Sequence, residues 1–502
     1  YNIFDKDGNQ LNGAAGFSPD ADMNLLSSGT CSGCSLDGSA GCFNTLLGAC
    51  AGKSLTSGYS NILIGCHAGC ALTNGIRNVI IGDRENQPGT GGNDNTLIGW
   101  NAGRCATGGS RNVMLGCEAG QCMSGDDNFV VGHRAGSKAT GTDSSILIGA
   151  EAGCLIGAGS HNIFIGCRAG QSSGTNTDND ASTNVAIGLQ AGQCLTDGDN
   201  NNFIGRGAGN NVTTGKYNAA FGHWAGKAST TSSYNLFLGY YAGCNKTTGD
   251  YNIALGKSAL QGTSGSATAE NNIAIGTLAY ECVTTGGKNI IMGNYAAPKA
   301  TTGSSNIFMG NNVVYTGVVT GSKNIAMGEC AAKVLTSGDS NVIMGNYAGG
   351  AITTGTDNIL LGCYVAKNSI SLCANILMGM ETGACLCNGS HNIIMGQYAG
   401  RGSSTVSDNT AAFNIAFGQE SLKVISSGQH NVALGKDTGM AVTSGGCNVM
   451  MGCGAGASLT TGATNVMLGL RAGYCGDEVH SNIMIGECAG CSTVCGSGVG
   501  CQ

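Results

Sequence analysis

The chain has 502 residues, including 88 Gly, 26 Cys and only 3 Pro, and 11% of its residues are charged. Its hydrophobic fraction of 41% is too high for a disordered chain, and the absence of a Gly-X-Y period excludes collagen. The net charge of −7 is small for this length and no apolar run reaches membrane-spanning length, so we expect no nucleic-acid partner and no membrane insertion.

Residues 1–43 precede the repeats described below, and we expect them to form an N-terminal cap or junction. The segment from Asp5 to Asn9 resembles the start of a calcium loop, but the Glu required at position twelve is absent, which favours a hairpin turn. Cys31 and Cys34 have the CxxC spacing of zinc and redox sites, yet no suitably spaced His or Cys pair completes a site. The N-terminal segment therefore predicts no metal and no cofactor.

The motif Asn-x-x-x-Gly then occurs 26 times, and 20 of the 25 intervals between successive motif glycines are 17 residues long. A short repeat with glycine corners fits one coil of a β-solenoid, whereas a helical repeat needs about 30 residues or more. The aliphatic residues between Asn and Gly also favour strands. We therefore predict an all-β fold, a parallel β-solenoid or β-roll of about 26 coils over residues 44–490, with a C-terminal cap or tail at 491–502.

Asn fills the first position of the motif in 25 of the 26 copies, and Ser145 is the one substitute. Stacked coils place the same amide at the same corner, about 4.8 Å from its neighbours, where the side chains can form a hydrogen-bonded ladder. The motif glycine that follows is expected to need a positive φ or a close backbone approach. The structural Asn ladder is predicted to include Asn61, Asn78, Asn95, Asn112 and Asn162.

The two residues before the motif glycine are apolar in all 26 copies, as in Leu63 and Ile64. Successive strand side chains point to opposite faces, so one of the two fills the coil and the other forms an apolar stripe outside it. Soluble monomers rarely expose such a stripe, so we expect parallel copies of the chain to associate through it, in the closed cyclic form that is usual for homo-oligomers. We place Leu63, Leu147 and Leu360 on this outer face and expect lysine at these positions to release monomers.

The pattern of Asn, aliphatic residues, Gly and a following Ala resembles the head repeat of trimeric autotransporter adhesins and similar repeats of bacteriophage tail fibres. The resemblance extends from about Asn44 to Gly490 and implies a trimeric left-handed parallel β-roll. This repeat is longer than is typical of the adhesins, and the chain lacks a heptad stalk and a membrane-anchor segment. These differences favour a phage or virion fibre over an adhesin.

The second residue after the motif glycine is mostly polar or aromatic, and we expect it to face outward. Aromatic rings on a surface can stack on sugar faces, and a repeated stripe can bind a repeating polymer with avidity. The same rings could instead pack at the interface between subunits, and the sequence leaves both interpretations open. The candidate glycan-binding stripe comprises Trp224, Tyr241, Tyr295, Tyr347, Tyr364 and Tyr398.

Cysteines gather at two positions of the repeat, just after the motif glycine and five or six residues after it. Column neighbours such as Cys105 and Cys122 would be separated by the coil spacing, about 4.8 Å, which is wider than the usual Cβ separation in a disulfide. We therefore favour free thiols, which suit assembly of a fibre in a reducing cytosol. A bridge between closer cysteines such as Cys66 and Cys70 is the alternative.

These features together predict a non-enzymatic structural fibre protein of a phage tail or virion, used for host attachment. Its partners would be two further copies of itself, a host polysaccharide or receptor, and virion or filament proteins at its termini. The alternatives are a bacterial cell-surface trimeric adhesin or extracellular filament subunit and, less favoured, a glycan-cleaving tailspike. The seven His and the carboxylates are scattered over different coils, so we expect no catalytic residue.

Overall fold

The computed structural model describes residues 18–20, 25–36, 41–83, 92–173, 179–263, 267–402 and 409–491, with residues 18–20 described by their backbone alone. The chain divides into two compact units, residues 1–251 and 252–502. The segment from Asp5 to Asn9 and residues 492–502 of the expected tail lie outside the described part. All regular elements of the described residues are strands, and none of these residues belongs to a helix that could cross a bilayer.

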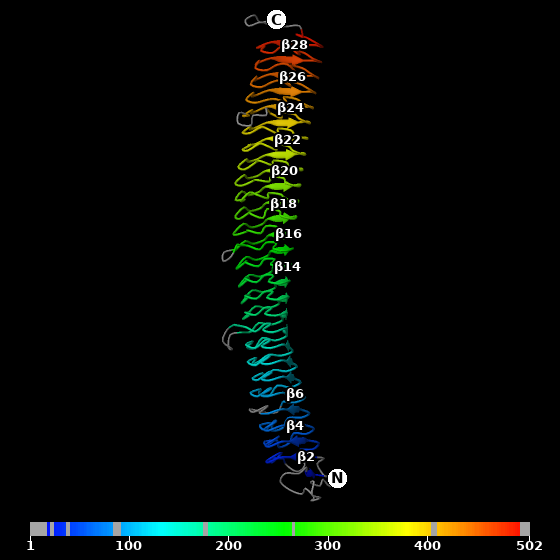
Figure 1. Ribbon diagram of the computed structural model, residues 1–502, viewed down its shortest axis with the longest axis vertical. Coiled ribbons are helices and arrows are strands. Elements are labelled where there is room, and N and C mark those ends of the chain that lie inside the picture. Colours follow the sequence, from blue (N-terminus) through cyan, green and yellow to red (C-terminus); the bar gives the residue numbers. More distant parts are fainter. Residues whose placement is uncertain are drawn as a thin grey trace. The chain divides into compact units, whose positions relative to one another are not determined.

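The first unit is a β-solenoid in which almost every coil contributes one strand of three residues (Figure 1). β1 (Ser18–Asp20) pairs antiparallel with β2 (Leu25–Ser28), and from β2 onward each strand of the unit pairs in parallel with the next. The other strands are β3 (Thr45–Leu47), β4 (Ile62–Ile64), β5 (Val79–Ile81), β6 (Thr96–Ile98), β7 (Val113–Leu115), β8 (Phe129–Val131), β9 (Ile146–Ile148), β10 (Ile163–Ile165), β11 (Val185–Ile187), β12 (Asn202–Ile204), β13 (Ala219–Phe221) and β14 (Leu236–Leu238).

The second unit has the same construction, and each of its strands pairs in parallel with the next. Its strands are β15 (Ile253–Leu255), β16 (Ile273–Ile275), β17 (Ile290–Met292), β18 (Ile307–Met309), β19 (Ile325–Met327), β20 (Val342–Met344), β21 (Ile359–Leu361), β22 (Ile376–Met378), β23 (Ile393–Met395), β24 (Ile415–Phe417), β25 (Val432–Leu434), β26 (Val449–Met451), β27 (Val466–Leu468) and β28 (Ile483–Ile485). The prediction of an all-β parallel solenoid with a repeat of about 17 residues is confirmed.

The parallel ladder begins earlier than the start of the repeats suggests. β2 pairs in parallel with β3, and Leu26 lies opposite Thr45. Gly29, which follows β2, has φ 125, close to the φ of 133 at the first motif glycine, Gly48. The segment that we expect to form a cap or junction therefore contributes a strand to the parallel ladder, although its sequence lacks the motif.

From β3 to β28 the middle residue of each strand points into the coil, and the residues on either side of it point outward. In β4 the exposed fraction is 0% for Leu63 but 40% for Ile62, and Ile64 is partly exposed. The assignment of Leu63, Leu147 and Leu360 to the outer face is therefore wrong, because all three are fully buried in the core. The predicted apolar outer face exists, but the first and third residues of the strands form it.

Large and small side chains share the core of neighbouring coils. In the first unit the buried Phe203 and Phe237 lie on either side of Ala220, to which both pair in register. Such alternation lets adjacent coils fill a common interior at normal packing density.

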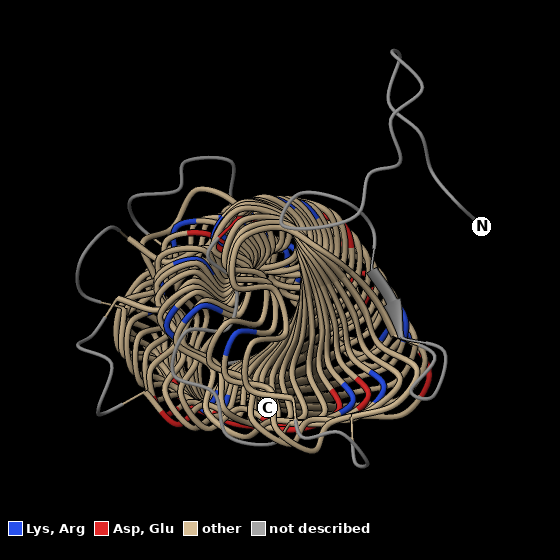
Figure 2. Cartoon of the chain, turned by 90° about the horizontal axis from the view of Figure 1, so that it is seen from below, with Lys and Arg blue, Asp and Glu red and all other residues tan. Residues whose placement is uncertain are grey.

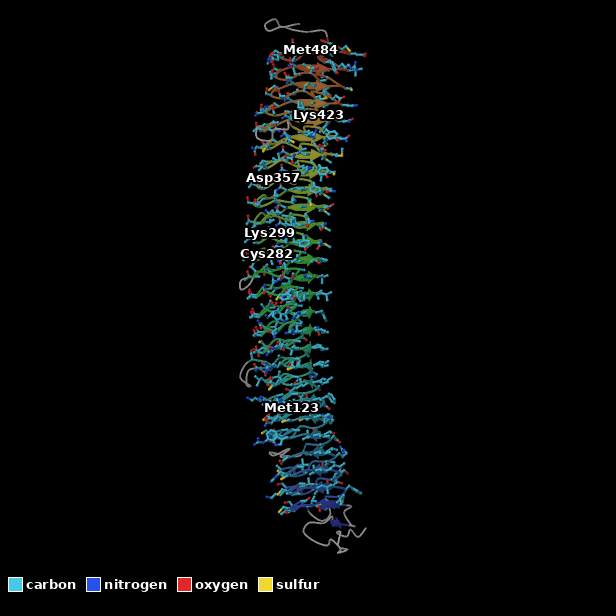
Figure 3. All side chains as sticks on the ribbon, viewed as in Figure 1. Met123, Cys282, Lys299, Asp357, Lys423 and Met484 are labelled. Atoms are coloured by element: carbon cyan, nitrogen blue, oxygen red, sulfur yellow. The ribbon has the colours of Figure 1, made fainter. Side chains whose placement is uncertain are left out.

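Outside the core the exposed side chains are mostly polar. Figure 3 labels one residue of each environment, the buried Met123 and the exposed Asp357.

Replacing Gly205 with alanine is expected to destabilise the first unit by about 3 kcal/mol or more, because the change combines backbone strain with a backbone clash. Gly205 has φ 131, and a Cβ at this position would lie 2.6 Å from the carbonyl oxygen of Gly222. Hydrogen exchange of the amides in β12 and β13 would measure the loss.

The matched control for this change is Gly486→Ala in the second unit. Gly486 has φ 123, but a Cβ there meets no described atom within 4 Å. This variant isolates the cost of the positive φ, about 1–3 kcal/mol. Equal losses at Gly205 and Gly486 would contradict the clash as the dominant cause.

Candidate functional site

The motif asparagines form a buried ladder of amides along each unit. The Oδ1 atom of Asn61 accepts hydrogen bonds from the backbone N and from Nδ2 of Asn78, at 2.9 and 3.1 Å. The Nδ2 atom of Asn61 donates to Oδ1 of Asn44 at 3.0 Å and to the carbonyl oxygen of Gly75 at 2.8 Å. These four bonds use both donors and both lone pairs of the amide. The buried members of the ladder in this unit include Asn61, Asn78, Asn95, Asn112 and Asn162.

Ser145 shows how the ladder continues through a hydroxyl. Its backbone N donates to Oδ1 of Asn128 at 3.0 Å, and its Oγ accepts from the backbone N of Asn162 at 3.0 Å. The hydroxyl donates to the carbonyl oxygen of Asp143. The ladder is therefore a structural element that is common to the coils and does not mark one of them as a binding site.

In nearly all described coils, two positions present their side chains from a left-handed turn. One is the residue before the motif Asn, such as Ser60 with φ 57, and the other is the second residue after the motif glycine, such as His67 with φ 62. We call these positions the Asn-side column and the Gly-side column. Non-glycine residues with positive φ are uncommon in proteins. Their recurrence along both units makes them part of the architecture, and the side chains that they display vary freely.

The Asn-side column of the first unit carries a stack of aromatic rings that our sequence analysis missed. The rings of Tyr217, Tyr234 and Tyr251 stack with centroids 5.0 Å apart at both steps, and each residue is about half exposed. The ring faces cover one another, so mainly the edges and hydroxyl groups are accessible. Their 17-residue spacing is the signal in the sequence that identifies them, and it lies at a different position of the repeat from the predicted stripe.

Charged residues alternate in the Asn-side column nearer the N-terminus. Arg77 Nε lies 2.6 Å from Asp94 Oδ1, and Arg111 Nε lies 2.6 Å from Asp127 Oδ1. The hydrogen bond from Arg77 lowers the pKa of Asp94. These pairs are exposed, so each contributes little to stability. Figure 2 shows charged residues of both signs as short separate segments of the coils, in agreement with the low charge content.

The predicted aromatic stripe in the Gly-side column is interrupted and consists of separate groups. In the first unit Trp224 and Tyr241 lie on neighbouring coils with ring centroids 5.5 Å apart, and Nζ of Lys227 lies 3.6 Å from the Trp224 ring centroid. The preceding position in the column is Gly207, so the column contributes two rings here. Two neighbouring rings join them: Tyr240 lies 4.4 Å from Tyr241 between centroids, and His223 contacts the other three rings.

In the second unit the four remaining tyrosines of the stripe form one neighbouring pair and two isolated rings of the column. Tyr295 makes an edge contact with Tyr315. Tyr398 lies beside the guanidinium of Arg401, whose central carbon is 5.7 Å from the centroid of the Tyr398 ring. Non-aromatic residues such as Glu381 separate these rings in the column. Only Tyr347 and Tyr364 are direct neighbours, with ring centroids 5.5 Å apart and planes inclined by 17°.

A surface groove lies beside the Tyr347 and Tyr364 pair. It has a volume of about 420 Å³ and is lined by Tyr347 together with Lys333, Lys367 and Asn368, among other residues. The Nζ atom of Lys367 lies 4.5 Å from the centroid of the Tyr364 ring. We call this feature the Tyr347 groove.

The Tyr347 groove adjoins a second, smaller cavity of about 160 Å³, which shares Lys367 and Asn368 and reaches Glu381 and Arg401. Arg401 Nε lies 3.2 Å from Glu381 Oε2, so this carboxylate is already paired. The two cavities thus combine aromatic surface, an amide and cationic groups along neighbouring coils. Such a combination can hold a sugar ring against an aromatic side chain and pair a carboxylate or sulfate with an ammonium group.

The cysteines of the described residues are all free thiols. The neighbours Cys105 and Cys122 hydrogen-bond instead of forming a bridge, and burial, with this hydrogen bond, raises the pKa of Cys122 to about 11. Burial likewise raises the pKa of Cys244 to about 11. A thiol with so high a pKa is a poor nucleophile at neutral pH, so these residues act as packing groups.

Comparison with known proteins identifies no relative of this chain. No family model matches the chain, and neither a curated protein nor a solved structure matches it.

Proposed function

We propose that the chain is a structural fibre protein of a phage tail or virion, which assembles as a homotrimer and serves attachment to a host. The apolar outer face of the strands carries this proposal. Ile62, Ile146 and Ile359 each lie beside a fully buried leucine and are 40%, 38% and 38% exposed. A run of such residues is unusual on the surface of a soluble monomer. Closed association of three copies through this face would remove it from water.

The mass of the intact chain in solution tests the assembly. Three copies of the 50.0 kDa chain have a mass of 150 kDa. We expect light scattering under reducing conditions to give this value, because the described cysteines are free and no disulfide is needed for assembly. A particle of 50.0 kDa at micromolar concentration would contradict the trimer.

The Tyr347 groove is the part of the surface that best supports host attachment through a saccharide. Lys333 and Lys367 line it, and the one acidic residue of the adjoining cavity, Glu381, is paired with Arg401. This surplus of positive charge favours polysaccharides that contain uronic acid or sulfate groups over neutral ones.

Replacing Lys367 with Gln is expected to weaken binding of a uronic-acid polysaccharide about tenfold, because one charge-assisted contact is lost. Tyr364→Asn should have a similar effect through loss of the ring, and Asn suits the left-handed backbone of Tyr364, which has φ 56. Calorimetric titration with alginate, and with dextran as a neutral comparison, would measure both variants.

The matched control for these variants is Lys299→Gln, which removes an exposed lysine of the same unit that does not line either cavity. It should bind alginate as the unmodified chain does. Equal weakening by Lys299→Gln and Lys367→Gln would show a diffuse electrostatic effect and would contradict a site at the groove.

A further inference from the structure

Three donors of metal-ligand type, from two neighbouring coils, lie together on the first unit. Cys66 and Asp83 each follow a motif glycine, so the parallel pairing of β4 and β5 places them one above the other. His67 follows Cys66 and stands in the Gly-side column. The Sγ atom of Cys66 lies 3.1 Å from Nδ1 of His67, and the donor atoms of all three residues lie within 4.8 Å of one another.

We propose that Cys66, His67 and Asp83 bind a divalent metal ion of the zinc class, with water in the fourth position. Zinc takes thiolate, imidazole and carboxylate ligands in a tetrahedron, which places neighbouring ligand atoms about 3.6 Å apart. The separation of Cys66 Sγ and His67 Nδ1 is 3.1 Å and no separation among the three donor atoms exceeds 4.8 Å, so rotations of the side chains can bring them to this geometry. The thiolate and the carboxylate together neutralise the two charges of the ion.

The combination of these residues is selective within the chain. Among the described residues no other group of three His, Cys, Asp or Glu donors is this close. Cys167 and Cys453 also follow a motif glycine directly and are also exposed. The next residue, however, is Arg168 or Gly454 and not a histidine. An exposed cysteine directly after a motif glycine is therefore not enough to form a site.

The three residues also suggest what a bound ion does. Cys66 and His67 follow β4, whereas Asp83 follows β5. An ion held by all three would join two coils through their side chains, in addition to the backbone ladder.

Alkylation of the intact, reduced chain with and without zinc tests this site at a single residue. We expect saturating Zn²⁺ to slow the reaction of Cys66 with iodoacetamide about tenfold or more, because a metal-bound thiolate is not free to attack. Mass spectrometry of the digested chain would report each cysteine separately. Cys167 and Cys453 serve as internal controls whose rates should change little.

Two variants keep the backbone and remove one ligand each. His67→Asn suits the left-handed turn, since Asn101 occupies the same column with φ 58. Asp83→Asn keeps the shape of the side chain and removes its charge. Both should abolish the protection of Cys66 by zinc. Protection that survives in both variants, or that is equal at Cys66 and Cys167, would overturn the proposal whatever the oligomeric state of the chain.

Discussion

Alanine in place of Asn341 is expected to destabilise the surrounding coils by about 3–6 kcal/mol, because several buried polar groups lose a partner at once. Nδ2 of Asn341 donates to Oδ1 of Asn324 and to the carbonyl oxygen of Gly355, at 2.9 and 2.7 Å. Oδ1 of Asn341 accepts from the backbone N and Nδ2 of Asn358, at 3.2 and 2.9 Å. A methyl group can replace none of these bonds.

Hydrogen exchange at β19, β20 and β21 is the suitable measurement for this variant. A repeat array unfolds in segments, so a single melting temperature does not define its stability. We expect amides of these strands to exchange faster, while those of distant coils of the same unit keep their protection. Uniform loss of protection through the second unit would contradict the local character of the ladder.

Asn341→Ser is the matched control, since Ser145 already fills this position in another coil. The hydroxyl can accept the backbone N–H of the next coil, as Ser145 does for Asn162 at 3.0 Å. It cannot replace both contacts of Nδ2. The loss should therefore be smaller than for alanine, and equal losses would mean that the backbone contact contributes little.

Lysine at Ile62, Ile146 and Ile359 is expected to convert the assembled form into folded monomers, because each charge would have to be buried at the proposed subunit interface. These residues are 38–40% exposed in the single chain, so each unit can still fold around them. The mass should fall to that of one chain while the β-sheet circular dichroism is retained.

The control places lysine at the adjacent leucines, Leu63, Leu147 and Leu360. Their side chains are fully buried, so an unpaired charge there should unfold the coils instead of separating subunits. The two sets differ by one residue along each strand, and opposite results are expected from them. A folded trimer with lysine at Ile62, Ile146 and Ile359 would contradict self-association through this face.

The sequence could predict the repeat and the ladder, but it did not lead us to the correct inner face. Both residues before the motif glycine are apolar, so hydrophobicity alone does not distinguish core from surface. A finer signal was present one residue earlier. Thr45, Thr96 and Asn202 occupy the first strand position, which shares its face with the residue just before the glycine. Polar residues at that position indicate that this face is the outer one.

The candidate site was harder to predict for a different reason. Tyr347 and Tyr364 could be identified from their spacing, but Lys333 and Lys367 belong to another position of the repeat. Only the path of the chain around the coil brings these two positions to one groove. The left-handed turns were also hidden, because residues as different as Arg77 and Tyr217 adopt the same positive φ there.

The in-register pairing of the strands has a consequence for inheritance. Intervals of 16 and 22 residues still bring Val113 opposite Phe129 and Ile163 opposite Val185, so the corners absorb the difference in length. Within a unit, loss or duplication of one whole copy would therefore leave every remaining strand with a compatible neighbour. Recombination between similar repeats of the gene could shorten or lengthen the protein in whole coils, and natural variants that differ in copy number should fold equally well.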